Sequence, residues 1–204
     1  MKSISKETYE TYRDKGSKFH SFLFPAQSKE DFEQRLEGLK SKYPDATHHC
    51  TAYRVNPLQI EEFSNDDGEP SGSAGLPILN ALKRNELVNA AAVVVRYYGG
   101  TKLGKSGLIE AYGTSTELCI ESASLQELKK VVRMTVRFQY DQQGTIEQIV
   151  HQFEGRHADS SYGADVELTL EFDAEHADAV YGKFQSIEYT GIDLSDPDFL
   201  YLSS

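Results

Sequence analysis

The amino-acid sequence predicts an α+β protein with two domains, and three observations lead to this prediction. The chain has 204 residues, enough for one large domain or two small ones. Strand-like and helix-like patterns alternate along it without an internal repeat. Charge is divided unevenly, since residues 1–130 carry 17 Lys/Arg and 18 Asp/Glu whereas residues 131–204 carry 4 and 14. We therefore expect domains at residues 1–129 and 130–204.

The first domain is expected to begin with a strand, a helix and a second strand. Residues 17–25 (SKFHSFLFP) are apolar and aromatic and end in a proline, which indicates a strand. Ser28 begins a helix that reaches Tyr43, because an S-x-x-D capping pattern precedes an apolar stripe at helical spacing. Residues 47–55 (THHCTAYRV) predict another strand, since Thr, Tyr and Val favour pleated surfaces.

A long polar segment separates these elements from the rest of the first domain. Residues 56–75 contain two prolines, three glycines and five acids, so we predict a functional loop without regular structure. Pro77 fits the first turn of a short helix over residues 76–85. Residues 89–98 are strongly apolar and predict a strand, and a glycine-rich turn then leads to a helix over residues 108–128.

The second domain shows a plainer alternation, which predicts a ferredoxin-like β-α-β-β-α-β sandwich. Its acidic character argues against contact with nucleic acid, because binding phosphate requires clustered Lys and Arg. The expected elements, in the order strand, helix, strand, strand, helix and strand, are residues 131–140, 144–155, 156–162, 165–173, 174–187 and 188–194.

The composition excludes several classes of protein. Hydrophobic residues make up 39% of the chain, yet no apolar run approaches the ~20 residues needed to cross a bilayer, so we expect no membrane partner. The first residues contain no apolar export signal, and we expect a cytoplasmic protein. Cys50 and Cys119 are the two cysteines, which fits free thiols in a reducing compartment.

Residues 99–106 (GGTKLGKS) match the P-loop pattern G-x-x-x-x-G-K-[ST]. In a P-loop, backbone amides surround the phosphates, and here Lys105 and Ser106 would contact phosphate and Mg²⁺. Such domains also need a mostly parallel sheet and an aspartate after an apolar strand. The strand that ends in Asp173 alternates polar and apolar residues, as a half-exposed antiparallel strand does. A tight strand-to-helix turn is therefore the favoured interpretation.

Other short patterns are weaker still. His48 and Cys50 share one face of a predicted strand, but no further ligand completes a tetrahedral metal site and no partner orients a thiol nucleophile. Ser71 occupies the place of the first glycine in a G-x-S-x-G elbow, which argues against a serine hydrolase. We assign no catalytic residue, no metal site and no cofactor.

Four segments resemble the YigZ/IMPACT family: KGSKF (15–19), DATHHCTAYR (45–54), DDGEPSGSAG (66–75) and VVVRYYGGTKLGKSGLIEAYG (93–113). The resemblance implies that the first domain has the fold of the second domain of ribosomal protein S5. It implies a ferredoxin-like second domain similar to the last domain of elongation factor G. Eukaryotic members regulate translation in the amino-acid starvation response by contacting a ribosome-associated activator, so the resemblance also implies a link to translation.

The family pattern bears on the P-loop match. In the family, Lys105 and Ser106 fall at variable positions, whereas the fixed positions are Arg96, Tyr97, Tyr98, Gly99, Gly100, Leu103, Gly104 and Gly107. The resemblance therefore implies that the P-loop match is accidental.

We expect a non-enzymatic, translation-linked regulator that binds the ribosome, RNA or a translation factor. Its surface would combine the acidic loop with the glycine-rich turn, where glycines admit a ligand, cations donate hydrogen bonds and two tyrosines offer stacking faces. The expected site residues are Asp66, Asp67, Gly68, Glu69, Ser71, Gly72, Arg96, Tyr97, Tyr98, Gly99, Gly100, Lys102, Gly104, Lys105 and Gly107.

Two alternatives stay open at this point. One is a phosphate- or nucleotide-handling enzyme that uses the 99–106 turn, with acids of the 66–69 loop as base or Mg²⁺ ligand. The other is a protein-interaction adaptor that uses the acidic second domain.

Overall fold

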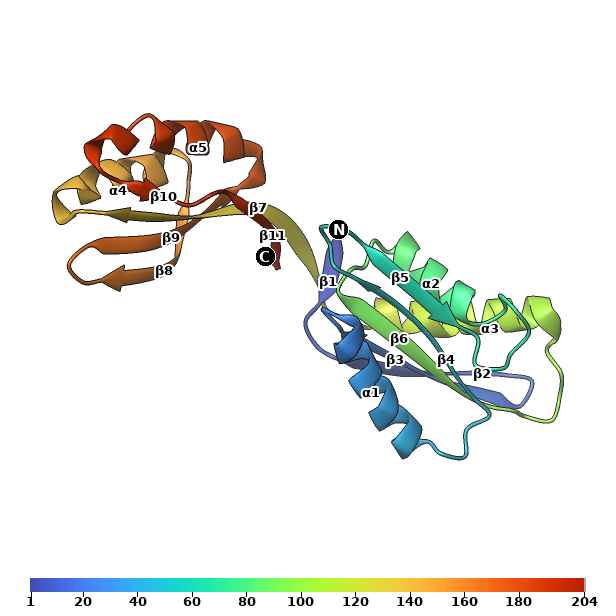
Figure 1. Ribbon diagram of the computed structural model, residues 1–204. Coiled ribbons are helices and arrows are strands. Elements are labelled where there is room, and N and C mark those ends of the chain that lie inside the picture. Colours follow the sequence, from blue (N-terminus) through green and yellow to red (C-terminus); the bar gives the residue numbers. More distant parts are fainter. Residues whose placement is uncertain (204) are drawn as a thin grey trace. The chain divides into compact units, whose positions relative to one another are not determined.

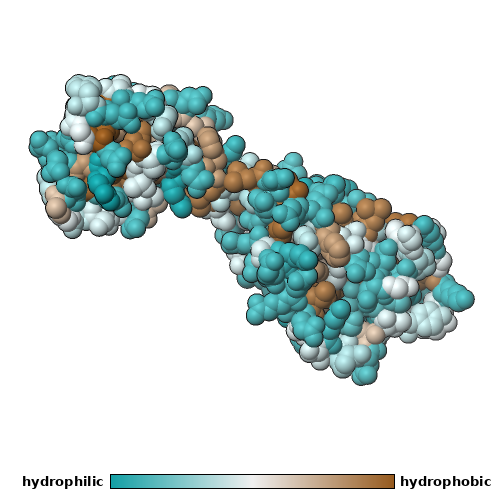
Figure 2. All heavy atoms as spheres, in the orientation of Figure 1, coloured by the Kyte–Doolittle hydropathy of each residue, from teal (hydrophilic) through white to brown (hydrophobic). Residues whose placement is uncertain are grey.

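The computed structural model describes residues 1–203, which form two compact units (Figure 1). Unit 1 is Met1–Leu128, and unit 2 begins at Lys129. Each unit combines an antiparallel sheet with packed helices, so the predicted α+β class with two domains is confirmed. Hydrophilic residues cover most of the face in view of each unit, with small hydrophobic patches between them (Figure 2).

Five strands form the main sheet of unit 1. β6 lies at its centre and is antiparallel to both neighbours. Because both faces of β6 are covered, it is a nearly continuous apolar run, the pattern that predicted it. In the order across the sheet, the strands are β2 (Thr8–Asp14), β3 (Ser17–Pro25), β6 (Ala90–Tyr97), β4 (His48–Val55) and β5 (Glu61–Asn65).

Helices cover both faces of this sheet (Figure 1). α2 (Gly75–Arg84) and α3 (Gly104–Glu121) pack on one face, and α1 (Lys29–Lys42) packs on the other. Successive side chains of a strand point to opposite faces, so Val94 enters the core under α2 and α3 while Val93 enters the core under α1.

The prediction of an irregular loop throughout residues 56–75 is wrong at β5. Residues Glu61–Asn65 pair antiparallel with Thr51–Val55 of β4. All five side chains of β5 are exposed, so the segment has no alternation of buried and exposed positions by which the sequence would display a strand. Pairing with β4 alone makes this segment regular.

The helix expected over residues 108–128 is α3, but its limits differ. It begins at Gly104 and ends at Glu121, and β7 (Leu125–Phe138) follows. The first residues of β7 pair with β1 (Lys2–Ile4), a short strand that we did not predict, as we did not predict β2. This pairing joins residues more than a hundred positions apart, so local sequence cannot show it.

Unit 2 has the predicted β-α-β-β-α-β order, with its sheet in the order β8, β9, β7, and with β10 and β11 both paired to β7. Helices α4 and α5 pack on one face and enclose the core with Phe138, Ile146 and Phe184. The last predicted strand is shorter than expected, and β11 was not predicted. After β7, the elements are η1 (Tyr140–Gln142), α4 (Gln143–Gln152), β8 (Arg156–Tyr162), β9 (Val166–Asp173), η2 (Ala174–His176), α5 (Ala177–Gln185), η3 (Glu188–Thr190), β10 (Asp193–Leu194) and β11 (Asp198–Ser203).

The first turn of α1 has the predicted capping box. The Ser28 side chain accepts a hydrogen bond from the Asp31 amide at 3.2 Å, and Asp31 Oδ2 accepts from the Ser28 amide at 3.2 Å.

We predict that Ser28→Ala lowers the free energy of unfolding by about 1 kcal/mol, because the Asp31 amide loses its acceptor. Urea denaturation followed by circular dichroism measures this. Ser41→Ala, at an exposed position of the same helix, is the matched control, and an equal loss in both variants would contradict the capping role.

Candidate functional site

The acidic loop and the glycine-rich turn meet at one end of the unit 1 sheet. Arg96, at the end of β6, donates a hydrogen bond from Nη1 to Glu69 Oε1 at 2.5 Å. His48, at the start of β4, lies with its Nδ1 2.7 Å from the Asp67 carbonyl oxygen. The two segments that the sequence marked for function are therefore in direct contact.

Glu69 is the centre of a cluster, buried except for the half-buried His48, that we call the Glu69 network: Glu69, Arg96, Tyr112, Cys50 and His48. Its Oε1 also accepts a hydrogen bond from the Tyr112 hydroxyl at 2.8 Å, and His48 Nε2 lies 3.8 Å away. The Cys50 thiol donates to the Asp66 carbonyl oxygen at 3.0 Å and lies 3.3 Å from the Tyr112 hydroxyl. The network joins the loop, β4, β6 and α3.

The thiol and the phenol of this network are held in their neutral forms. Burial raises the pKa of Cys50, and the nearby carboxylates of Glu69 and Asp67 add to the effect. Burial likewise raises the pKa of Tyr112, supported by Cys50 and Glu69. Since a thiolate is the nucleophilic form of cysteine, Cys50 is an internal residue rather than a reactive one.

Arg96 does not reach the surface as the donor that the sequence suggested. Its exposed fraction is 5%, and Nη2 donates to Ser17 Oγ at 3.2 Å. The guanidinium lies 5.4 Å from the ring centre of Phe19 and 5.6 Å from that of Tyr98. The reason is strand alternation, which turns Arg96 toward the α2 and α3 face, where Glu69 neutralises it.

Asp66 organises the backbone of the acidic loop. Its carboxylate accepts hydrogen bonds from the amides of Gly72 at 2.8 Å, Ala74 at 3.0 Å and Gly75 at 2.8 Å. Ala74 precedes α2 and has no side chain to cap the helix, so Asp66 supplies the missing acceptor. Burial opposes ionisation of Asp66, but these amides and the nearby Lys105 outweigh it and hold the pKa of the carboxyl below its usual range.

The three acids of the loop do not act together on one point. Asp67 accepts from the His49 amide at 2.6 Å, whereas Asp66 binds the loop amides and Glu69 binds Arg96. Among the described residues, no group of three or more His, Cys, Asp or Glu side chains is arranged to hold a metal ion. The arrangement does not favour the alternative in which these acids serve as a shared base or Mg²⁺ site.

The glycine-rich turn is explained by close backbone contact. A Cβ on Gly99 would lie 1.9 Å from the carbonyl carbon of Gly16, so only glycine fits there. Gly100 and Gly104 have φ values of +86° and +73°, which favour glycine as well. Gly104 starts α3 after an antiparallel strand, so the P-loop letters stand outside the parallel sheet of nucleotide hydrolases.

The remaining predicted residues of these two segments lie at the surface or in turns. Gly68 has a φ of +87° and lies against the His48 ring. The other side chains, or the glycine backbones, are exposed or half-buried and make no ligand-like cluster in the described chain: Ser71, Gly72, Lys102, Lys105 and Gly107.

Tyr97, on the α1 face of β6, and Tyr98, directly after the strand, belong to a second feature at the same sheet end. Together with Lys18, His20 and Tyr43 they form what we call the aromatic–lysine surface, a hollow of ≈ 400 Å³. Lys18 stands directly opposite Tyr97 in the β3–β6 pairing. The His20 ring is 5.9 Å from Tyr43 in a stacked arrangement and 5.9 Å from Tyr97 in an edge arrangement.

Positive charge gathers on this face because of strand alternation. β2 places Tyr9, Thr11 and Arg13 on the face of the aromatic–lysine surface and its acids Glu10 and Asp14 on the opposite face. Burial lowers the pKa of His20, and the nearby Lys18 and Arg13 lower it further. The hollow is therefore lined by rings and bordered by cations.

Sequence reasoning named Tyr97 and Tyr98 but missed their neighbours. Lys18 and His20 come from β3, and Tyr43 from the end of α1. The alternation Lys18, His20, Phe22 was visible in the predicted strand, but its pairing partner was not. Tyr43 reaches the hollow only through packing of α1 on the sheet.

We predict that the Glu69–Arg96 ion pair is strongly coupled. Glu69→Gln should cost about 3–5 kcal/mol in the free energy of unfolding, because it leaves a buried guanidinium without its charge partner. The double change Glu69→Gln with Arg96→Met should cost less than the sum of the two single changes. Urea denaturation of the four proteins measures this coupling. Glu167→Gln, in the exposed pair with Arg137, should cost little, and additive effects at Glu69 and Arg96 would refute the coupling.

The lowered pKa of Asp66 predicts a pH dependence. Since the fold favours the carboxylate, its stabilising effect is complete above the unfolded pKa of about 3.9 and is lost as pH falls through the lower folded value. The difference in free energy of unfolding between the natural protein and Asp66→Asn should therefore shrink as the pH falls below about 4. Denaturation at a series of pH values tests it, with the exposed Asp45→Asn as control. A difference that stays constant down to strong acid would contradict the assignment.

Comparison with known proteins places the chain in a family. Residues 15–120 match the Impact N-terminal domain, and residues 136–187 match a second family described as a domain of unknown function (DUF1949). A solved structure described as a hypothetical protein has a TM-score of 0.67 and 29% identity, and the match covers 95% of each chain. No described helix is long and apolar enough to pass through a membrane.

Proteins with similar sequences support the same family assignment. The chain is 34% identical over 151 residues to the IMPACT family member YvyE of Bacillus subtilis, covering 74% of this chain and 70% of that protein. It is 35% identical over 156 residues to the IMPACT family member YigZ of Escherichia coli, covering 76% of each. The resemblance in the four sequence segments is thereby confirmed, and the chain belongs to the IMPACT family.

Proposed function

We propose that this protein is a translation-linked regulator whose unit 1 binds single-stranded RNA on the aromatic–lysine surface. The observation that carries the proposal is the gathering of Tyr43, Tyr97 and Tyr98 with Lys18 and His20 around one hollow. Aromatic faces stack on unpaired bases of any sequence, while cations neutralise the backbone phosphates. An open sheet face that carries both is a suitable platform for a single strand.

Two details support the stacking role. Tyr98 has an exposed fraction of 46%, so one side of the residue is open to a ligand while the Arg96 guanidinium lies 5.6 Å from its ring centre. Lys42 Nζ lies 5.3 Å from the ring centre of Tyr43, which places a cation beside a second ring. Each of the two rings therefore has a cation beside it.

The charges favour unit 1 for this contact. Residues 131–204 carry 4 Lys/Arg against 14 Asp/Glu, which repels phosphate. Unit 1 carries 15 Lys/Arg against 18 Asp/Glu, a much smaller excess of acids, and Arg13, Lys18 and Lys42 concentrate positive charge near the hollow. Unit 2 would then face solvent or a basic protein.

The link to translation rests on the family. The sequence resemblance implies regulation of translation for eukaryotic members, and similarity extends to the IMPACT homologue of Caenorhabditis elegans, with 37% identity over 102 residues. That match covers 47% of this chain and 39% of the homologue. Ribosomal RNA or messenger RNA is the RNA that a regulator of translation meets, and the aromatic–lysine surface suits its unpaired segments.

Binding of a fluorescent uridine oligonucleotide, followed by fluorescence anisotropy at low salt, tests the proposal. Tyr98→Ala should weaken binding by about 1–3 kcal/mol, since one stacking platform is lost. Tyr162→Ala is the matched control, because Tyr162 is 58% exposed and lies in unit 2. Lys18→Gln should weaken binding and reduce its salt dependence.

The link to translation is tested by co-sedimentation of the same variants with ribosomes at low salt, which measures whether the aromatic–lysine surface contributes to ribosome association. Absence of oligonucleotide binding at low salt, or equal binding by Tyr98→Ala and the natural protein, would refute RNA binding. Binding to the oligonucleotide without ribosome association would refute the link to translation alone.

A further inference from the structure

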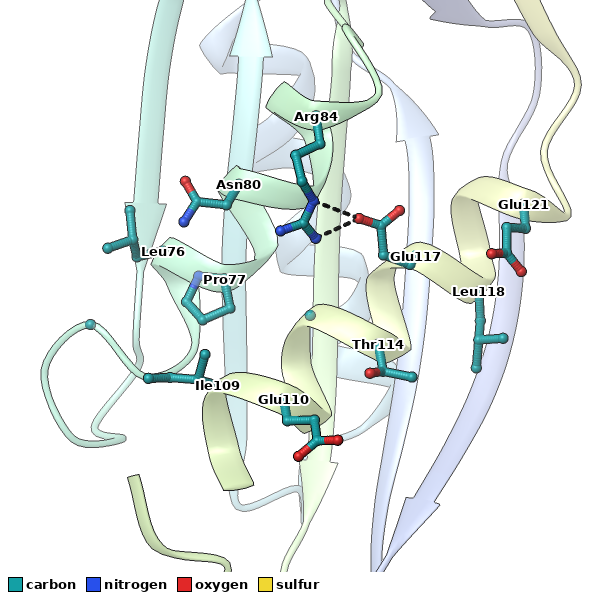
Figure 3. A pocket seen from close by; sticks show the side chains of 12 residues that line it. Leu76, Pro77, Asn80, Arg84, Ile109, Glu110, Thr114, Glu117, Leu118 and Glu121 are labelled. Carbon is teal, nitrogen blue, oxygen red and sulfur yellow. Dashed lines mark hydrogen bonds and ion pairs between the residues drawn. The ribbon is translucent and has the colours of Figure 1, made fainter. Parts of the chain in front are cut away.

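A groove lies between α2 and α3, on the sheet face opposite the aromatic–lysine surface. Its volume is ≈ 510 Å³, and its residues come from the two helices and the end of the acidic loop (Figure 3). We call it the helical groove. The lining residues that matter for binding are Leu76, Arg84, Ile109, Glu110, Leu118 and Glu121.

The helical groove exposes large apolar side chains that do not pack in the hydrophobic core. Leu76 on α2 has an exposed fraction of 47%, and Ile109 on α3 has one of 42%. The α2 residues that do pack inward, such as Ile78 and Leu82, are fully buried. Large apolar side chains that stand together at a concave surface indicate a contact with another molecule.

The border of the helical groove is acidic. Glu110 and Glu121 have no hydrogen bond or ion pair among the described residues, and both are exposed. Glu117 lies between them in sequence and accepts a hydrogen bond from Arg84 at 2.5 Å (Figure 3). It also accepts one from Asn85 at 2.7 Å, and the two contacts tie α3 to α2. Two unpartnered carboxylates thus border an apolar floor, while the one lining cation is already neutralised.

We propose that the helical groove binds an amphipathic helix of a protein partner, with the apolar face in the groove and Lys or Arg along its flank. The helical groove is long enough for such a helix. Along α3, the distance from Ile109 to Glu121 is about 18 Å, which corresponds to about three turns of a bound helix. Apolar anchors at i, i+3, i+4 and i+7 would contact Leu76, Ile109 and Leu118. Basic residues beside them would meet Glu110 and Glu121.

A second copy of this chain suits the helical groove less well. A symmetric dimer through this face would bury the same acidic border from both copies in one interface, without an unpaired lining Lys or Arg to neutralise Glu110 and Glu121. The helical groove and the aromatic–lysine surface lie on opposite faces of one sheet, so a bound helix would not block RNA. The proposal does not depend on RNA binding.

The test uses the full chain and a labelled helical peptide of about 14 residues, built from leucine on one face and lysine on the other. Fluorescence anisotropy should show saturable binding. The charge reversal Glu110→Lys with Glu121→Lys should weaken it at least tenfold. Glu37→Lys with Glu61→Lys makes the same change in net charge at exposed acids away from the groove, and it should leave binding within about twofold, since distant surface charges are screened.

The apolar floor is tested separately. Ile109→Asp should weaken binding at least tenfold, whereas Leu58→Asp, at an apolar residue with an exposed fraction of 55% on another part of unit 1, should not. Circular dichroism verifies that each variant is folded. Equal weakening by the two charge-reversed doubles, or equal binding of a leucine–glutamate peptide, would overturn the proposal. So would a dimer in sedimentation equilibrium that Ile109→Asp dissociates, because a second copy would then be the occupant.

Discussion

The buried ion pair between Glu69 and Arg96 is the interaction on which the organisation of unit 1 depends. Their side chains have exposed fractions of 4% and 6%, so neither charge is stabilised by bulk water. Removing two charges from water is costly, and the pair is tolerable only because Tyr112 and Ser17 add further hydrogen bonds. A loop, a central strand and a helix are thereby held at one point.

This arrangement also decides which residues remain available for binding. Arg96 faces inward, and the next residue of the strand, Tyr97, faces the other side of the sheet. Two consecutive residues therefore have different roles: Arg96 forms a buried ion pair, and Tyr97 places an aromatic ring at the surface. Gly99 is needed because its backbone approaches Gly16 closely, and Gly100 and Gly104 have positive φ values, so backbone geometry accounts for these glycines without phosphate binding.

The two faces of the unit 1 sheet carry different chemistry. On the α1 face, the end of the sheet carries the aromatic rings and cations of the aromatic–lysine surface. The opposite face is covered by α2 and α3, and the helical groove between them has an apolar floor and an acidic border. A regulator that contacts both an RNA and a protein needs two such surfaces. The antiparallel sheet provides them by alternation alone, since each strand contributes to both faces.

The sequence by itself determined the features that local physics controls. The capping box at Ser28, the apolar run of β6 and the β-α-β-β-α-β order of unit 2 follow from patterns of a few residues. The motifs around Glu69 and Arg96 also predicted that the acidic loop and the glycine-rich turn would lie together, as they do, without showing which side chains are buried.

Tertiary structure decided the rest, because the partners are far apart in the chain. β5 is regular only through its pairing with β4, and the buried charge of Arg96 is neutralised only because Glu69, 27 residues earlier, reaches it. Tyr43 joins the aromatic–lysine surface through packing of α1, and the helical groove exists only where α2 and α3 meet. Long-range contacts of this kind depend on burial and pairing between distant segments, and no local pattern of residues encodes them.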